Sequence, residues 1–405
     1  MVGKEAMTTP APPATPAPQR LASIDAYRGL VMFLMMAEVL AFGKLAQAFP
    51  DSAFWGLLEH HQSHVAWRGC SLHDLIQPSF SFLVGVALPF SLAARLARGQ
   101  SYGRMFGHAV WRSLALIGLG IFLRSIGRPQ TNFTFEDTLT QIGLGYTFLF
   151  LLGTQPLKVQ WAGVGLILLG YWAAFALYPL PGADFDYAKT GVVAAWEHNA
   201  TGLTAHWNKN TNLAWAFDTW FLNRFPREHL FVNNGGGYST LSFIPTLGTM
   251  VLGLIAGGWL RSAYSDGQKL QRLVLAGVLG LAAGWLLDAA GLCPNVKRIW
   301  TPAWVLFSGG WCFLLLAGFY VVMDVARFKA WALPLVVIGM NSIAAYCMDW
   351  LFVGFIRRSL ATHLGEDSFK LFGAAYATLV QGALVLLALW LILFWMYRRR
   401  LFLKI

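Results

Sequence analysis

The sequence predicts an all-α polytopic membrane protein, a bundle of about ten transmembrane helices with one longer external loop. Composition is the first reason, because 57% of the 405 residues are hydrophobic and only 12% are charged. Soluble domains contain about 25% charged residues, so this chain has too few to cover a surface that faces water on every side. Length is the second reason, because apolar runs of roughly 18–25 residues recur along the chain and each can cross a bilayer.

The predicted spans follow a Pro- and Ala-rich segment, residues 1–19, which cannot bury a core and is expected to be a disordered cytoplasmic tail. Residues 20–405 are then a single transmembrane domain, with its external loop at about residues 179–238. The first span begins after Asp25–Gly29 and extends to about residue 49. The other spans are expected near residues 75–97, 109–126, 138–153, 159–178, 239–260, 272–290, 302–322, 333–355 and 371–396.

Lysine and arginine between the spans predict the orientation, because short cytoplasmic loops carry an excess of both. Most of these residues fall on one side if the spans alternate: Arg95, Arg98, Arg104, Arg112, Arg261, Lys269, Arg272, Arg327, Lys329 and Arg398–Arg400. Lys297–Arg298 and Arg357–Arg358 lie on the other side. We therefore expect both termini in the cytoplasm. Orientation also accounts for the net charge of +11, so nucleic acid is not expected as a partner.

The stretch from His64 to Phe80 carries the strongest chemical signal, just before the second span. Imidazole exchanges protons near neutral pH, and a nearby carboxylate can orient it. We predict that His64 is catalytic on the external side and that Asp74 orients it or holds a substrate amine. The alternative for Asp74 is to cap the second span, since aspartate is a preferred N-cap residue. The alternatives for His64 are its neighbours, His60, His61 and His73.

Four further residues are expected to bind the substrate that His64 acts on, which is called the acceptor below: Trp67, Glu38, Gln77 and Asn234. Glu38 lies near the middle of the first predicted span, where an uncompensated charge costs at least ~2.5 kcal/mol. We therefore expect it to face a polar cavity continuous with that of His64. Tryptophan rings can stack on sugar faces, or simply pack and anchor a loop at the membrane interface. Both interpretations stay open for the external-loop tryptophans, Trp196, Trp207, Trp215 and Trp220.

Six segments occur in the order of motifs of a known family: Arg20–Leu30, His64–Phe80, Thr138–Gly143, Gly237–Pro245, Asn295–Pro302 and Ile338–Ile343. In the second of them, the pattern His-x-x-Trp-x-Gly is followed by Asp-Leu and Pro-x-Phe. In these segments the chain resembles the heparan-α-glucosaminide N-acetyltransferase family of transmembrane acyltransferases. It looks like a bacterial-type homologue without the extra N-terminal luminal region of the lysosomal members, and this resemblance implies a bacterial inner membrane as its location. Two departures, Ile142 in place of Arg and a shifted Pro245, leave the acceptor and the acyl group open.

The resemblance implies an enzyme that transfers an acetyl group from cytoplasmic acetyl-CoA to an amino sugar or related glycan on the external side, and His64 matches the family's histidine. It also implies a lipid bilayer as surroundings, and a homodimer is one expectation. Residues expected to bind CoA are Arg28, Asp25, Gln141, Asn341 and Ser342. A guanidinium suits the CoA phosphates, but Arg28 and Asp25, three apart on a helix, could simply pair. Asn341 and Ser342 could instead hydrogen-bond between helices.

Several alternatives stay open. His64 could act as general base in a direct transfer, or carry the acyl group itself. The acceptor could be a hydroxyl of a polysaccharide or lipid-linked glycan, and a proton-coupled transporter or flippase is the rival from another class. No metal is expected, because the four cysteines form no CxxC pair. A disulfide between Cys70 and Cys293, both in predicted external loops, is an open alternative.

Overall fold

The structure is a computed structural model that describes residues 21–403. The predicted disordered tail, residues 1–19, and Arg20 of the first motif lie outside the described residues. The described part is helical, and its one β-bridge joins Arg68 to Val296. Its α-helices are α1 (Ala22–Met36), α2 (Phe42–Ala48), α3 (Ala53–Gln62), α4 (Ile76–Leu96), α5 (Tyr102–Ser125), α6 (Thr138–Gly153), α7 (Leu157–Ala176), α8 (Leu213–Phe221), α9 (Phe243–Arg261), α10 (Asp266–Ala289), α11 (Pro302–Tyr320), α12 (Leu333–Met340), α13 (Ser342–Leu364) and α14 (Ala377–Arg398).

The prediction of an all-α polytopic membrane protein is confirmed. Within residues 21–403, seven helices are long and apolar enough to cross a bilayer, or up to nine if each of two bent pairs is one span. The predicted segment near 138–153 is the shorter apolar helix α6. The estimate of about ten spans is therefore close, but three of its members are not straight, full-length helices.

Two of the predicted spans are broken, which the apolar pattern alone does not reveal. The first bends by 43° between the 3₁₀ helix η1 (Ala37–Leu40) and α2. Ala41 lies at this bend with a left-handed backbone, φ 50°. The second bends by 69° at Asn341, between α12 and α13. Glu38 is therefore on a 3₁₀ turn next to a break, and not within a continuous helix.

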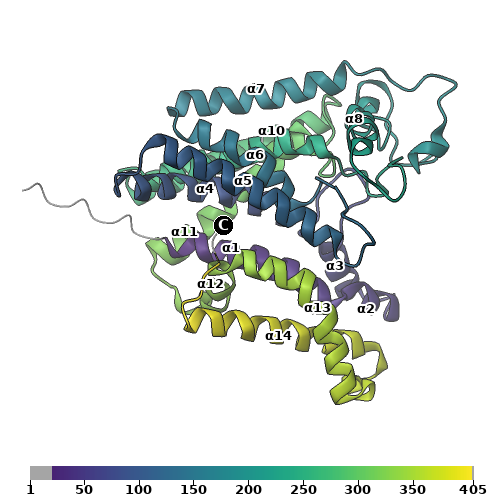
Figure 1. Ribbon diagram of the computed structural model, residues 1–405, viewed down its shortest axis with the longest axis vertical. Helices are drawn as coiled ribbons and strands as arrows, with labels where there is room; N and C mark the ends of the chain where they lie inside the picture. Colours follow the sequence, from purple (N-terminus) through teal and green to yellow (C-terminus); the bar gives the residue numbers. More distant parts are fainter. Residues whose placement is uncertain (1–20, 404–405) are drawn as a thin grey trace, which may run out of the picture.

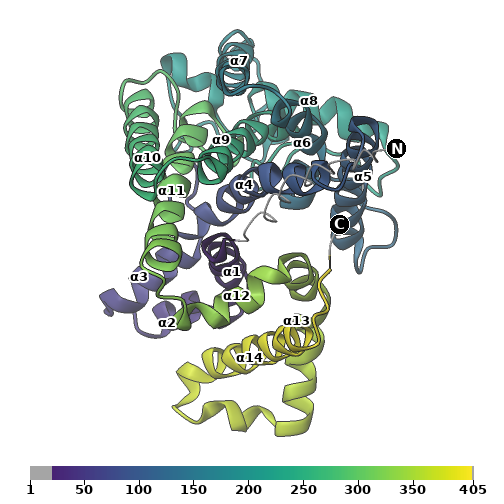
Figure 2. The same ribbon diagram turned by 90° about the vertical axis from the view of Figure 1, so that its left-hand side faces the viewer.

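The bundle is arranged around α1. Figure 2 shows α12, α13 and α14 on one side of α1, and α4, α9 and α11 on the other. Glycines allow the closest approaches: a Cβ at Gly253 of α9 would collide with the Phe82 carbonyl oxygen of α4, and one at Gly339 of α12 would collide with the Asp25 carbonyl oxygen of α1. A side chain is not tolerated where two helix backbones come this close.

Both ends of the described chain lie at one end of the bundle, where α1 begins and α14 ends (Figure 1). The Asn341 amide donates to the Leu401 carbonyl oxygen at 2.9 Å and accepts from the Leu403 N–H at 3.1 Å, which fastens the end of the chain to the α12–α13 break. The segment with α8 lies at the opposite end, together with α3. The two ends of the described chain and the 179–238 segment thus lie at opposite ends of the bundle, and the orientation of the bundle in the membrane stays a prediction.

The 179–238 segment is folded and not an open loop. It packs through a hydrophobic cluster that is separate from the main core of the bundle and includes Trp67, Phe175 and Trp207; we call it the second hydrophobic cluster. Trp207 is completely buried, and its carbonyl oxygen accepts the indole N–H of Trp67 at 3.2 Å. These two tryptophans therefore serve packing. Cys70 and Cys293 are free thiols, as are Cys312 and Cys347, so the open alternative of a disulfide is not realised.

Candidate active site

The loop that carries His64 is fixed at both of its ends. At its start, the Gln62 side chain bridges the break after η1, because its Nε2 donates to the Ala37 carbonyl oxygen and its Oε1 accepts the Phe42 N–H, each at 2.7 Å. At its end, the Gly69 N–H donates to the Asn295 carbonyl oxygen at 3.1 Å. Gly69 has φ 118°, a conformation that favours glycine. The loop is thus held between α1 and the segment that connects α10 to α11.

Asp74 organises the centre of this loop and is buried, with 1% of its side chain exposed. Its Oδ2 accepts from the backbone N–H groups of Val65 (3.3 Å) and Ser71 (3.1 Å). Its Oδ1 lies 2.8 Å from His64 Nδ1. The alternative in which Asp74 caps the second span is wrong, because the N-cap residue of α4 is Leu75 and no side chain caps that helix. The carboxylate instead orients the imidazole.

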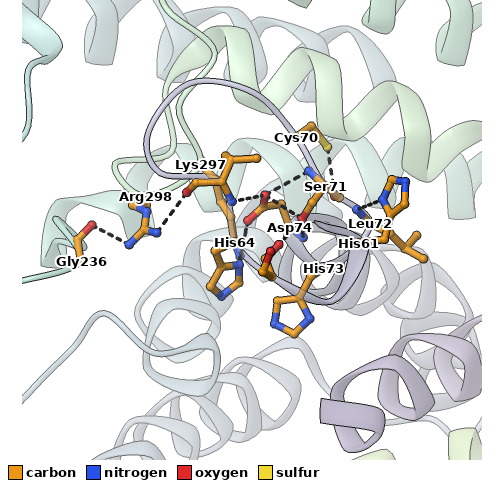
Figure 3. A network of polar contacts seen from close by, with 12 residues as sticks. His61, His64, Cys70, Ser71, Leu72, His73, Asp74, Gly236, Lys297 and Arg298 are labelled. Carbon is orange, nitrogen blue, oxygen red and sulfur yellow. Dashed lines mark hydrogen bonds and ion pairs between the residues drawn. The ribbon is translucent and has the colours of Figure 1, made fainter. Parts of the chain in front are cut away.

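Lys297 completes the cluster, and sequence reasoning missed it. Its side chain is 4% exposed, and its Nζ lies 3.2 Å from Asp74 Oδ1 and 3.1 Å from His64 Nδ1 (Figure 3). Burial lowers the pKa of His64 below its ordinary 6.5, and the charge of Lys297 lowers it further, whereas the hydrogen bond with Asp74 acts in the opposite direction. Burial also lowers the pKa of Lys297, against the attraction of Asp74. His64 is therefore neutral at neutral pH.

His64 opens onto a polar cavity of about 470 Å³ that penetrates between the helices. Its Nδ1 is taken by the loop contacts, and 35% of its side chain remains exposed, so Nε2 is the nitrogen available to a substrate. The imidazoles of His64 and His73 project from the loop on the same side (Figure 3), with ring centroids 4.5 Å apart. This geometry is that of an oriented, neutral imidazole facing a substrate-sized space.

Three of the four residues predicted to bind the acceptor line this cavity: Glu38, Gln77 and Asn234. Glu38 thus faces the cavity of His64, as predicted, with its carboxylate 3.2 Å from His73 Nε2. The fourth, Trp67, does not reach the cavity, because its ring is buried in the second hydrophobic cluster. A separate hollow of about 130 Å³ shares Asn234, Glu136 and Tyr238 with the main cavity.

The residues predicted to bind CoA are dispersed. Gln141 is buried near the His64 end, where its Nε2 donates to the carbonyl oxygens of Phe135, Ser239 and Thr240. It thereby ties the start of α6 to the start of α9 and does not line the cavity. The remaining four belong to elements at the other end of α1. There Arg28 pairs with Asp25 at 3.7 Å, and Asn341 binds the end of the chain. Ser342 begins α13 next to it.

The cavity wall also contains charged groups that were given little or no role from sequence. Arg124 of α5 stacks its guanidinium 4.7 Å from the ring of Trp350 on α13. Glu136, Asp137 and Asp349 add carboxylates. Burial raises the pKa of both Glu136 and Asp137. A signal for Lys297 did exist, because Lys297–Arg298 falls on the predicted external side, where basic residues are disfavoured. Among residues 21–403, no group of His, Cys, Asp and Glu could hold a metal ion.

The fold and this cluster define a class of protein: a polytopic helical membrane protein with a His–Asp–Lys site at the mouth of an intramembrane cavity. No protein-family profile matches the chain. Heparan-alpha-glucosaminide N-acetyltransferase of Homo sapiens is 24% identical over 437 aligned residues, which cover 96% of this chain and 60% of the human protein. The enzyme of the same name from Mus musculus is 24% identical over 428 residues, with 95% and 60% coverage. Both relatives align with nearly the whole of this chain, in agreement with the family resemblance of its six motifs, and the chain spans about 60% of their length.

Proposed function

We propose that the protein is a membrane acyltransferase that moves an acetyl group from acetyl-CoA to the amino group of a sugar or glycan. The observation that carries the proposal is the oriented His64–Asp74 pair on the wall of a cavity of about 470 Å³. General bases are recognised by geometry of this kind, in which a second group fixes the imidazole and its other nitrogen faces the substrate. The names of the two relatives supply the reaction class.

In the direct route, His64 Nε2 takes a proton from the acceptor amine as the nitrogen attacks the thioester carbonyl carbon. The new C–N bond forms and the C–S bond breaks. The imidazolium then returns the proton to the leaving thiolate, which departs as CoA thiol. Asp74 accepts the Nδ1–H hydrogen bond throughout, which holds the tautomer whose Nε2 is the basic nitrogen. In the alternative route, Nε2 itself attacks the thioester and carries the acetyl group to the amine.

The charges of the cavity support an amine over a hydroxyl as acceptor. Glu38, Glu136 and Asp349 present carboxylates to the same space as His64. An acceptor that arrives as an ammonium ion is attracted by such a field, whereas a neutral hydroxyl is not. The ammonium ion gives its extra proton to one of these carboxylates or to water before the neutral amine attacks the thioester. The side-chain amides of Gln77 and Asn234, on the same wall, offer hydrogen bonds to sugar hydroxyls or to the oxyanion that develops on the thioester.

The donor would extend along α1. Arg28 and Asp25 lie near its first turn, while Met35 and Glu38 line the cavity at its other end. Ten residues of helix separate Arg28 from Glu38, roughly 15 Å at 1.5 Å per residue. This span is comparable to a pantetheine arm, so phosphates near Arg28 and a thioester near His64 are compatible with one bound acetyl-CoA.

The test is transfer of radiolabelled acetyl groups by the purified protein in lipid nanodiscs. We expect acetyl-CoA consumption that requires glucosamine and His64, with an N-acetylated product. Acetylation of hydroxyl-only sugars at equal rate would replace the proposal by an O-acyltransferase. No acetyl-CoA consumption, together with proton-coupled sugar uptake into vesicles, would replace it by a transporter. Single-turnover trapping of acetylated His64 would select the covalent route.

A further inference from the structure

We propose that Lys297 is a positioning residue for His64: it shares the Asp74 carboxylate, so that the imidazole remains neutral with a bare Nε2 toward the cavity. The inference rests on the proposed function of His64 and adds a residue that acts through it. Three polar atoms, one each from Asp74, His64 and Lys297, lie within contact distance of one another. Asp74 Oδ1 lies 2.8 Å from His64 Nδ1 and 3.2 Å from Lys297 Nζ, and Nζ and Nδ1 are themselves 3.1 Å apart.

A carboxylate beside a histidine favours the charged imidazolium, because opposite charges within about 4–6 Å stabilise each other. Asp74 alone would therefore keep His64 protonated to higher pH and leave less of it able to accept a proton. The ammonium group of Lys297 reverses this effect, since it cancels most of the Asp74 charge and repels an imidazolium at close range. The pair still orients the ring, because Nδ1–H can donate to Oδ1.

Lys297 is not needed to hold the loop in place. The loop is fastened to the same segment by the Gly69–Asn295 backbone bond, and by Arg298, which donates to the carbonyl oxygens of Val65 (3.1 Å) and Gly236 (2.8 Å). A buried ion pair is also poor evidence for stabilisation, since its desolvation penalty can exceed the Coulombic gain. A buried lysine beside the imidazole is better explained by its effect on that imidazole.

Other charged groups surround His64 and set the background on which Lys297 acts. They come from every element packed against it: Asp74 and His73 of the 3₁₀ helix η2 (His73–Leu75), Glu38 of η1, Arg124 of α5, Glu136 and Asp137 before α6, Tyr238 before α9, Arg298 beside Lys297, and Asp349 of α13. Lys297 lies closer to His64 than this background does, because its Nζ is within 3.1 Å of the imidazole Nδ1. Its removal should therefore dominate over any rearrangement of the rest.

The experiment measures the fraction of neutral His64 directly, without an acyl-transfer assay. Diethyl pyrocarbonate modifies neutral imidazoles, and the tryptic peptide from Leu45 to Arg68 contains His60, His61 and His64. Tandem mass spectrometry after brief modification at a series of pH values gives a midpoint for each histidine. We expect Lys297→Met to raise the His64 midpoint by about one pH unit or more, from the loss of a charge at contact distance. The midpoint of exposed His60 should not move.

Two matched variants separate charge from structure. Lys297→Arg keeps the charge and should keep the His64 midpoint, whereas Asp74→Asn should lower it. Lys297→Gln, which retains hydrogen bonding, serves if the Met variant fails to fold. A folded Met or Gln variant with an unchanged or lower His64 midpoint would overturn the proposal. Failure of the proposed function is seen separately, as a wild-type protein that does not transfer acetyl groups. Such a protein can still show a higher His64 midpoint in the Lys297 variant than in the wild type.

Discussion

The two ends of α1 present charged side chains in different ways. At its start, Arg28 pairs with Asp25 three residues away on the same helix. Beyond its other end, Glu38 contacts His73, in a cavity where Asp74 and Lys297 surround His64 although 233 residues separate the lysine from the histidine. A local pair needs only helical spacing, while the His64 cluster needs the completed fold. The second end is therefore where chemistry depends most on tertiary structure, and the following predictions test that difference.

The largest effect should come from His64→Ala. Loss of a general base typically costs about 10²-fold or more in rate, and we expect acetyl transfer to fall by at least that factor. Binding of acetyl-CoA, measured by isothermal titration, should be largely retained. His60→Ala, an exposed neighbour, is the matched control. Near-native turnover of the His64 variant would transfer the role to His73 or His61.

Asp74→Ala should be the most damaging change for stability, because it leaves the buried Lys297 ammonium without its partner. Breaking a buried pair in this way costs about 3–5 kcal/mol, so the thermal midpoint should fall by many degrees. Lys189→Ala removes the exposed pair with Asp186 and should cost no more than about 1 kcal/mol. Equal midpoints for the two variants would show that the cluster contributes no more than a surface pair.

The pH dependence follows from the lowered pKa of His64. A base with a lowered pKa stays neutral through neutral pH and is protonated only on the acid side. We expect kcat/KM to be constant around pH 7 and to fall tenfold per pH unit below a midpoint under 6.5. An acid limb with its midpoint above 6.5 would show that Asp74 outweighs burial and Lys297.

Glu38→Gln should have a smaller effect, confined to binding of a cationic acceptor. A charge contact at about 4 Å in a wet cavity contributes about 1 kcal/mol, so KM for glucosamine should rise about fivefold with kcat nearly unchanged. The fold should tolerate the amide, which keeps the shape and most hydrogen bonds of the carboxylate. Unchanged kinetics across pH would assign Glu38 to packing and to its contact with His73.

The smallest functional effect is expected for Ala200→Cys, which probes orientation alone. We expect an impermeant thiol reagent to label it in intact cells while transfer activity is retained. Labelling only after lysis would place the His64 end of the bundle in the cytoplasm and reverse the direction of the proposed reaction.

The membrane spans and the His64–Asp74 pair could be predicted from sequence because each rests on local pattern: apolar length, and two reactive side chains ten residues apart. The bends at Ala41 and Asn341 could not, since hydropathy does not record backbone direction. Trp67 was predicted to bind substrate because a tryptophan ring can stack on a sugar. The same ring can also pack in a hydrophobic core, and in the structure Trp67 packs against the 179–238 segment. Lys297 was used only to predict the orientation in the membrane, because its contact with His64 joins residues 233 positions apart and forms only in the folded chain.

Gln62 links the bend after η1 to the loop that carries His64, because one side-chain amide satisfies the backbone on both sides of that bend. Two residues later the chain reaches His64. Since Ser63 alone separates Gln62 from His64 along the chain, a change in the angle between α2 and α1 is expected to move the His64 loop as well.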